Sequence, residues 1–250
     1  MTDPDPLFSV QGQRALVTGG CAGLGRAMAE ALLERGAHVA IADISPHVAG
    51  TAHDMGALPL LVDLSDRAQA QALVGRAVQA LGGLDILVNN AGAQRRHPAE
   101  DFPLEDWDFV LSINLHAAWI LAQAAGRVML AQGSGRIINV CSMLSFGGGL
   151  TVPAYSASKG ALAQLTKALS NEWAARGVNV NAIAPGYMDT ALNTALVGNP
   201  DREPGILARI PAGRWGVPDD LKGIVVFLSS DASRYIHGAI IPIDGGYLGR

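Results

Sequence analysis

Tyr155 and Lys159 are the two side chains whose types and spacing most directly suggest chemistry. They stand in Tyr155-Ser-Ala-Ser-Lys159 at the start of a long helical pattern, and this spacing places both on one helix face. A tyrosine hydroxyl has an ordinary pKa of about 10 and is a poor base near neutrality. An ammonium about 4 Å away supplies energy of the order needed to lower that pKa. We therefore expect Tyr155 to act as a general acid/base, with a boundary aromatic and a solvated lysine as the ordinary alternatives.

Two further polar residues could complete such a site. Ser142 follows an apolar run in Asn139-Val-Cys-Ser142, where its hydroxyl could hydrogen-bond an oxygen that changes charge during a reaction. Asn114 interrupts an apolar helical pattern, and an amide in that place needs a reason, such as holding a water that links Lys159 to solvent. The structural alternatives are a loop hydroxyl for Ser142 and a kinked helix for Asn114.

A glycine-rich loop lies near the start of the chain and reads T-G-x-x-x-G-x-G. Because glycine has no Cβ, such a loop brings backbone N–H groups and a helix N-terminus close to a pyrophosphate. The spacing differs from the common G-x-G-x-x-G fingerprint, and a tight strand-to-helix turn is the alternative. The candidate pyrophosphate-binding residues are Gly19, Cys21, Ala22, Gly23, Leu24 and Gly25.

Asp43 ends the second apolar run, where a carboxylate can accept hydrogen bonds from an adenosine ribose, and Ile44 after it is a further candidate cofactor contact. A 2′-phosphate would meet this carboxylate as a like charge, and neither Ile44 nor the loop residues Cys21 and Ala22 supplies a guanidinium. The nearest cation, Arg26, is expected to point along its helix. The sequence therefore predicts NAD rather than NADP, with an ordinary turn residue as the alternative for Asp43.

Seven short apolar runs alternate with helical patterns and must position these side chains. The runs cover residues 15–18, 38–43, 58–63, 85–89, 136–141, 178–184 and 239–243. Parallel strands need crossover connections, so this order predicts a single α/β domain over residues 1–250 with a doubly wound seven-stranded parallel sheet and helices on both faces. Ligands then bind at the carboxyl ends of the strands. The irregular segment 185–214, which contains Pro200, Pro204 and Pro211 after Pro185, is predicted to be a substrate lid.

Composition narrows the class of protein further. The chain has 250 residues, of which 49% are hydrophobic and 16% charged, with a net charge of −4, so it is too apolar for disorder and lacks the basic surface that nucleic acid requires. No uninterrupted apolar stretch of about 20 residues predicts a membrane span, and the first residues lack a secretory pattern. Cys21 and Cys141 stand in no metal-binding cluster. We expect a cytoplasmic protein with no bound metal and with neither nucleic acid nor membrane as a partner.

These motifs, taken in order with Asn89-Asn-Ala-Gly92 and Pro185-Gly186, resemble the short-chain dehydrogenase/reductase family over residues 8–250. The resemblance implies a Rossmann fold, a nicotinamide cofactor and a homotetramer. It further implies a catalytic tetrad in which Tyr155 transfers the proton, Lys159 also holds the nicotinamide ribose, Ser142 orients the substrate and Asn114 supports a water relay. The remaining cofactor contacts that it implies are Asp63, Leu64, Asn90, Ala91, Gly92, Pro185, Gly186, Met188 and Thr190, with Ile183 or its neighbours beside the nicotinamide.

Local stretches such as Ile210-Pro-Ala-Gly-Arg-Trp-Gly216 resemble the branch of this family that oxidises sugar acids. Arg95 and Arg96 directly follow the Asn-Asn-Ala-Gly motif, and a guanidinium matches a carboxylate through two hydrogen bonds. A solvated loop pair is the alternative. The other candidates for the substrate pocket are Met143, Tyr187 and His97.

This branch implies NAD-dependent oxidation of a secondary alcohol on a deoxy-keto-sugar acid. Three alternatives remain. The first is a reductase of carrier-bound 3-oxoacyl groups, which shares the tetrad but normally prefers NADPH. The second is a gluconate or polyol dehydrogenase of the same family. The third is a nucleotide-binding protein without catalysis, for which Lys159 one helical turn after Tyr155 would have no purpose.

Overall fold

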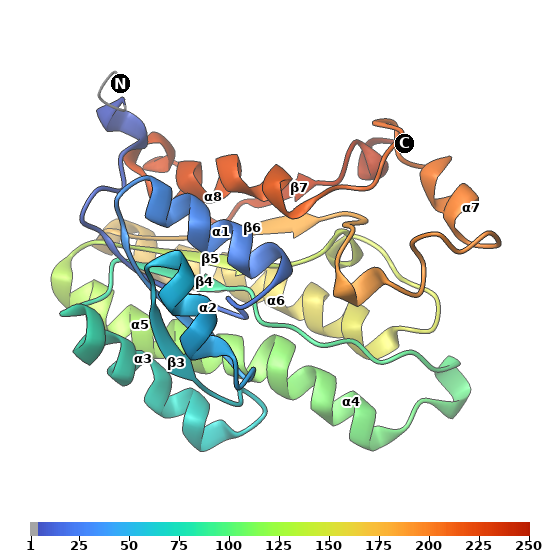
Figure 1. The fold of residues 1–250 in the computed structure, drawn as a ribbon, viewed down its shortest axis with the longest axis horizontal. Coiled ribbons are helices and arrows are strands. Elements are labelled where there is room, and N and C mark those ends of the chain that lie inside the picture. Colours follow the sequence, from blue (N-terminus) through green and yellow to red (C-terminus); the bar gives the residue numbers. More distant parts are fainter. Residues whose placement is uncertain (1–4) are drawn as a thin grey trace.

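Seven parallel strands form one sheet at the centre of the computed structural model, which describes residues 5–250 (Figure 1). The strand order is β3-β2-β1-β4-β5-β6-β7. Strands β2 and β3 are therefore added on one side of β1, and strands β4 to β7 on its other side. The predicted doubly wound sheet is confirmed, and residues 1–4 of the predicted domain lie outside the described part. The strands are β1 (Arg14–Thr18), β2 (His38–Asp43), β3 (Leu58–Leu61), β4 (Ile86–Asn89), β5 (Gly135–Val140), β6 (Val178–Pro185) and β7 (Ile240–Ile243).

Helices cover both faces of the sheet, as predicted. On one face α1 (Gly23–Glu34), α2 (Val48–Met55) and α8 (Lys222–Ser229) bury Met28, Val48 and Leu228 in a single apolar cluster. On the other face α3 (Arg67–Leu81), α5 (Ala118–Gln132) and α6 (Pro153–Trp173) bury side chains such as Leu73 and Leu121. Because both faces are covered, the central strand β4 is buried along its whole length, which explains why three of its four residues are apolar.

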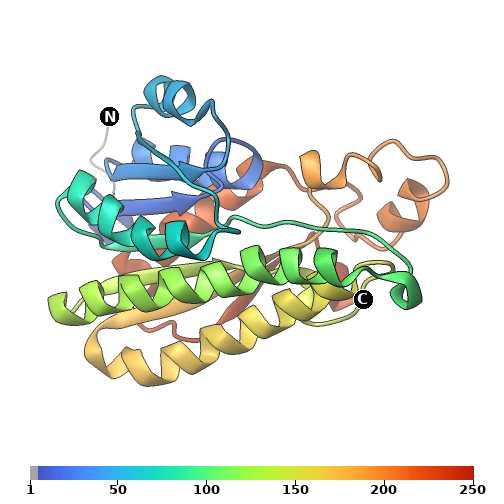
Figure 2. The same ribbon diagram turned by 90° about the horizontal axis from the view of Figure 1, so that it is seen from below.

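A continuous helical run lies beside α6 on the second face (Figure 2). It comprises α4 (Leu104–Leu111), a π-helical segment (Ser112–Ala117) and α5. By length and composition this run of 29 residues could cross a membrane, although 44% of its most apolar window is buried within the fold. The run packs against α3, α6 and the sheet, so its apolar residues belong in large part to the core.

The chain leaves the sheet after β6 and forms the irregular segment predicted to be a lid. It contains a 3-10 turn (Ala191–Asn193) and the short helix α7 (Glu203–Leu207), which projects beyond the sheet near the C-terminus (Figure 1). Leu196, Ile206 and Ile210 form its own small apolar cluster, separate from the two main clusters. Met188 at the start of the segment is buried in the first main cluster, whereas the part that contains α7 has this small core of its own.

Candidate active site

A cavity of about 680 Å³ lies at the carboxyl ends of the central strands and brings the predicted residues together. Residues predicted for the nucleotide and residues predicted for the substrate line the same space, as the topology requires. The predicted residues on its walls are Gly19, Ala22, Gly23, Leu24, Asn90, Ala91, Gly92, Arg96, Ser142, Met143, Tyr155, Lys159, Pro185, Gly186, Tyr187, Met188 and Thr190.

Tyr155 and Lys159 stand on the first turns of α6, which begins with Pro153. Lys159 Nζ donates a 2.6 Å hydrogen bond to the carbonyl of Val140 and lies 5.7 Å from the centre of the Tyr155 ring. Burial lowers the pKa of Lys159 to about 8. Burial also raises the pKa of Tyr155, and a hydrogen bond with Ser142 only partly opposes that rise. Desolvation of the hydroxyl thus opposes the lowering expected from Lys159, which stays a prediction for the site with its cofactor bound.

Ser142 is held in place by its own turn. Its Oγ accepts a 3.1 Å hydrogen bond from the backbone of Leu144 at the start of a short 3-10 turn. Ser145 Oγ accepts a hydrogen bond from the Ser142 N–H at 3.3 Å and donates one of 2.8 Å to the carbonyl of Lys159. Ser145 thus ties the loop after β5 to α6 and fixes Ser142 relative to Tyr155. No motif in the sequence indicated this role for Ser145.

Asn114 lies in the π-helical segment, which confirms that it interrupts a regular helix. Its Nδ2 donates to Ser158 Oγ at 3.0 Å, and Ser158 Oγ donates to the carbonyl of Tyr155 at 2.8 Å. Its Oδ1 accepts a 2.7 Å hydrogen bond from the backbone of Ala93. The buried amide therefore joins the loop after β4 to the helix that carries the reactive pair.

The glycine-rich loop has the geometry that a pyrophosphate needs. Gly19 and Gly23 have φ values of 65° and 53°, which other residues rarely adopt. A Cβ on Gly25 would lie 2.1 Å from the carbonyl oxygen of Gly19, so only glycine lets the helix start this close to the strand. Thr18 Oγ1 accepts hydrogen bonds of 3.0 Å from the N–H groups of Asn90 and Ala91. These residues fit a dinucleotide that passes over the loop.

Asp43 lies beside this loop, not on the cavity wall. Its two carboxylate oxygens accept hydrogen bonds from the backbone of Cys21 at 3.0 Å and of Ser45 at 2.9 Å. Arg26 pairs with Glu30 at 2.9 Å and points along its helix, as expected. Burial and the nearby carboxylate raise the pKa of Cys21 to about 11, so the thiol stays protonated at neutral pH.

Asp63 and Leu64 also lie outside the residues that line the cavity. Asp63 Oδ1 accepts hydrogen bonds from the backbone and the hydroxyl of Ser65, at 2.8 and 2.7 Å. Asp63 therefore stabilises the turn after β3. Contact of this pair with adenine remains a prediction, as does contact of Asp43 and Ile44 with the ribose.

The structure separates the two arginines that were expected to bind substrate. Arg95 pairs with Asp106 at 3.2 Å, and its guanidinium lies 4.4 Å from the centre of the Phe109 ring. His97 Nε2 lies 2.6 Å from the other oxygen of Asp106. Neither residue lines the cavity, so the expectation for Arg95 is wrong: its guanidinium already has a carboxylate partner. Arg96 lines the cavity, and no ion pair joins it to a carboxylate within residues 5–250.

Sequence reasoning missed residues of the lid segment and of the C-terminus. Tyr187 packs edge-on against Trp215 and Tyr247, with ring centres 5.4 and 5.5 Å apart. The C-terminal residues Tyr247 and Leu248 thereby reach the same cavity. No short motif reports such contacts between distant segments. The unpredicted residues on this side of the cavity include Leu192, Asn193, Leu196, Arg202, Ile206 and Arg209.

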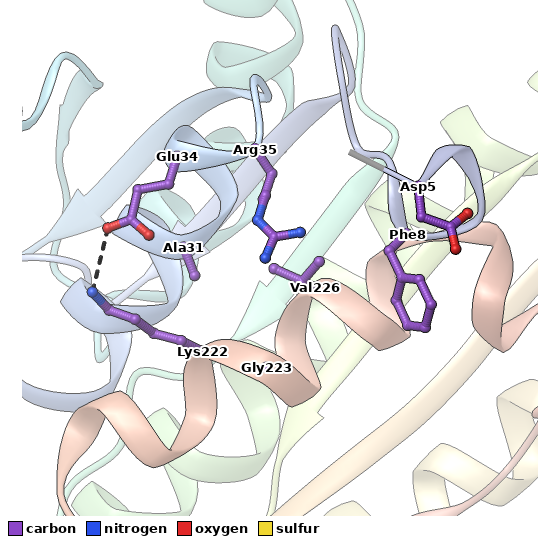
Figure 3. Close-up of a pocket in the computed structure, with 8 residues that line it drawn as sticks. All are labelled: Asp5, Phe8, Ala31, Glu34, Arg35, Lys222, Gly223 and Val226. Carbon is purple, nitrogen blue, oxygen red and sulfur yellow. Dashed lines mark hydrogen bonds and ion pairs between the residues drawn. The ribbon is translucent and has the colours of Figure 1, made fainter. Parts of the chain in front are cut away.

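A second hollow of about 440 Å³ lies between α1, α8 and the start of the described chain (Figure 3). Lys222 Nζ and Glu34 Oε1 form an ion pair of 3.4 Å on its wall, and Phe8 lies at its other end. None of the residues predicted to do chemistry lines it. Across residues 5–250 no cluster of three or more His, Cys, Asp or Glu side chains could hold a metal ion.

The geometry of the first cavity defines a class of protein. A glycine-rich loop at the switch point of a doubly wound sheet binds a dinucleotide, and here a Tyr/Lys pair faces the same space. The family model described as enoyl-(acyl carrier protein) reductase matches residues 19–248. The chain therefore belongs to the short-chain dehydrogenase/reductase family of oxidoreductases, whose cofactor is a nicotinamide dinucleotide.

Individual relatives within this family are closely similar over nearly the whole chain. A 2-dehydro-3-deoxy-D-gluconate 5-dehydrogenase of Pseudoalteromonas atlantica is 47% identical over 97% of this chain and 98% of its own. A proposed NAD(P)-dependent gluconate 5-dehydrogenase from Beutenbergia cavernae, solved with NADP at low occupancy, has a TM-score of 0.95 and 46% identity over 98% of this chain and 100% of its own. A proposed 2-deoxy-D-gluconate 3-dehydrogenase from Agrobacterium tumefaciens, solved with NADP, has a TM-score of 0.91, the same identity and the same coverage.

Proposed function

We propose that this protein is an NAD-dependent dehydrogenase that oxidises a secondary alcohol of a sugar acid to a ketone. We further propose 2-dehydro-3-deoxy-D-gluconate or a closely similar hexonate as its substrate. The observation that carries this proposal is Arg96, a cation without an acidic partner that lines the same cavity as Tyr155. A guanidinium in that position suits a substrate carboxylate. The names of the relatives agree with this substrate class.

The chain's own residues divide the chemistry of this oxidation among them. The oxidised nicotinamide supplies the hydride acceptor when it is bound. Tyr155 accepts the proton of the substrate hydroxyl, and Ser142 hydrogen-bonds the same oxygen. Because burial raises the pKa of Tyr155, proton transfer depends on positive charge at the reacting centre, which Lys159 contributes in its protonated form. Asn114 positions α6 and the loop after β4, and supports a water that passes the proton from Lys159 to solvent.

The proposal of NAD over NADP depends on Asp43. Backbone hydrogen bonds from Cys21 and Ser45 hold its carboxylate at the end of β2, where it would repel a 2′-phosphate. Arg26 on α1 is paired with Glu30, so it is not placed to neutralise that phosphate. The two solved relatives described above carry NADP, so cofactor preference needs a direct measurement on this protein.

A reductase of carrier-bound 3-oxoacyl groups is the second candidate, because the matching family model is described as an acyl-carrier-protein reductase. Such an enzyme shares the tetrad but needs a long acyl group, not a small anion, in the cavity. Such reductases normally prefer NADPH, so Asp43 at the end of β2 counts against this candidate. We also propose that the protein is a cytoplasmic homotetramer. The partly exposed Trp119 on α5 is an apolar residue that a subunit interface would cover.

A substrate panel tests the proposed function. NAD reduction is measured with hexonates, deoxy-hexonates including 2-dehydro-3-deoxy-D-gluconate, neutral polyols and 3-hydroxyacyl thioesters. We expect the highest kcat/KM for a hexonate or deoxy-hexonate. A higher kcat/KM for the thioesters, or for the neutral polyols, would replace this proposal with the corresponding alternative.

A further inference from the structure

Cationic side chains outnumber carboxylates on the wall of the active-site cavity. Arg96, Lys159, Arg202 and Arg209 line it, whereas Asp201 is the one acidic residue among its described lining residues. Asp201 is exposed on the lid segment. An excess of one charge in a cleft attracts ligands of the opposite charge, so this wall favours an anion.

Two of the four cations already have a role. Lys159 donates to the carbonyl of Val140 and belongs to the catalytic tetrad. The guanidinium of Arg209 lies 4.3 Å from the centre of the Tyr247 ring, so it packs on the C-terminal segment. Arg96 and Arg202 remain, and neither forms an ion pair within residues 5–250. By contrast, Arg214 near the end of the lid segment pairs with Asp220 at 2.7 Å.

Arg96 and Arg202 come from different parts of the fold and act on each other through their charges. Arg96 belongs to the loop after β4, and Arg202 precedes α7 in the lid segment. The pKa of Arg96 is lowered first by burial and next by the positive charge of Arg202. Two like charges that face one cavity repel each other, and a bound anion between them removes that repulsion.

The residues around Arg202 leave its charge unneutralised. The next residue, Glu203, accepts a 2.7 Å hydrogen bond from Trp215 Nε1 and is directed to that indole. The backbone N–H of Arg202 is held by the carbonyl and the side chain of Asn199, at 3.2 and 3.1 Å. Backbone contacts therefore fix the position of Arg202 in the lid segment, while its guanidinium is free to bind a ligand.

We propose that Arg202 of the lid segment and Arg96 of the loop after β4 together bind the substrate's carboxylate. The substrate anion then draws the lid segment toward Tyr155. This inference rests on the proposed function, because it identifies the side chains that bind the carboxylate of a sugar-acid substrate. Because Arg202 belongs to the lid segment, its contact with the carboxylate stabilises the closed lid only when the substrate carries this charge.

Kinetics of Arg202 variants test this inference. The wild type and Arg202→Gln are compared on two substrates, the hexonate that the wild type oxidises fastest and its uncharged amide, which keeps every hydroxyl. Loss of a charge-assisted contact is expected to raise KM for the hexonate about 10- to 100-fold and to reduce the preference for hexonate over amide by a similar factor. Arg202→Lys keeps the charge without the planar fork and is expected to lie between the two proteins.

Arg176→Gln is the matched control, because Arg176 is an exposed arginine that lies beyond the C-terminal end of α6 and outside the cavity. It is expected to retain wild-type constants. Lid closure is followed by hydrogen exchange of residues 191–210 in the presence of NADH. Adding the hexonate is expected to protect this segment in the wild type and in Arg176→Gln, but not in Arg202→Gln.

The outcomes distinguish this inference from the proposed function. If the wild type oxidises no hexonate, the proposed function fails, whatever the variants do. Suppose that the wild type oxidises a hexonate, and that Arg202→Gln has the wild-type KM, the wild-type preference for hexonate over amide and the wild-type protection of the lid segment. The two-arginine site is then wrong, and the proposed function stands. If Arg176→Gln also lost the preference for hexonate over amide, the effect would come from the lower net positive charge of the protein and not from Arg202 itself. That result would also overturn the inference.

Discussion

Backbone atoms form the nucleotide half of the cavity, whereas side chains from separate loops form the substrate half. In the first half, Gly19, Gly23 and Gly25 shape a turn at the end of β1, and Thr18 fixes the neighbouring loop through two backbone N–H groups. In the second half, Arg96 comes from the loop after β4 and Arg202 from the lid segment. We therefore expect the nucleotide half to be the more rigid of the two, and the substrate half to carry the specificity.

The largest expected effect concerns Tyr155, which lies where the two halves meet. Tyr155→Phe removes the hydroxyl that transfers the proton and leaves the ring, so kcat is expected to fall about 10²- to 10⁴-fold. NADH binding, followed by fluorescence titration, is expected to stay within about twofold of wild type because the nucleotide half is intact. Near-full turnover in a variant that still binds NADH would show that Tyr155 is not the acid/base.

The rigidity of the nucleotide half is tested at Gly25. A Cβ there meets the carbonyl oxygen of Gly19 at 2.1 Å, so Gly25→Ala forces the helix away from the strand. The free energy of unfolding is expected to fall by about 1–3 kcal/mol, with weaker NADH binding. The control is Gly75→Ala in α3, where a Cβ meets nothing within 4 Å and is expected to stabilise the helix by about 0.5–1 kcal/mol. Urea denaturation measures both, and equal stabilities for the two variants would contradict a tightly packed loop.

Specificity in the substrate half is tested by comparing two adjacent arginines. Arg96→Gln removes a cation from the cavity and is expected to raise KM for the hexonate about 10- to 100-fold. Arg95→Gln loses a partly exposed ion pair with Asp106, which is worth about 0–1 kcal/mol, and the contact with the Phe109 ring, both outside the cavity, so its KM is expected to change little. Steady-state kinetics check both variants. A larger rise in KM for Arg95→Gln than for Arg96→Gln would show that Arg95, and not Arg96, binds the substrate.

The smallest expected effect concerns the end of β2. Asp43→Asn keeps the shape of the side chain and removes the charge that would repel a 2′-phosphate. The ratio of kcat/KM for NADP to that for NAD is expected to rise about tenfold, which corresponds to about 1.4 kcal/mol of removed repulsion. Initial rates with each cofactor at a saturating hexonate concentration give the ratio. If the ratio does not change, Asp43 does not select the cofactor.

The two halves also differ in how well the sequence predicts them. Apolar runs bounded by turn residues located every strand within two residues, because buried parallel strands need continuous apolar sequence. The glycine spacing and the order of Asn114, Ser142, Tyr155 and Lys159 placed the nucleotide loop and the reactive pair in one cavity. These features are local, or are set by the topology of the sheet.

What the sequence did not predict depends on contacts between distant segments. Arg95 was expected to bind substrate, but α4 places Asp106 beside it and the two side chains form an ion pair. The lid arginine Arg202 and the C-terminal Tyr247 reach the cavity only because the chain returns to it after β6 and β7. The raised pKa of Tyr155 follows from its burial, which spacing along a helix does not report.

The central claim is that this cavity oxidises an alcohol on a molecule whose carboxylate the protein recognises. The most direct test is kcat/KM of the wild-type protein for NAD reduction with a hexonate and with the amide of the same hexonate, because the pair differs only in charge. The account predicts that the hexonate is preferred about tenfold or more, as expected for the loss of a charge-assisted hydrogen bond. Equal values for the two substrates, or a preference for the amide, would contradict it.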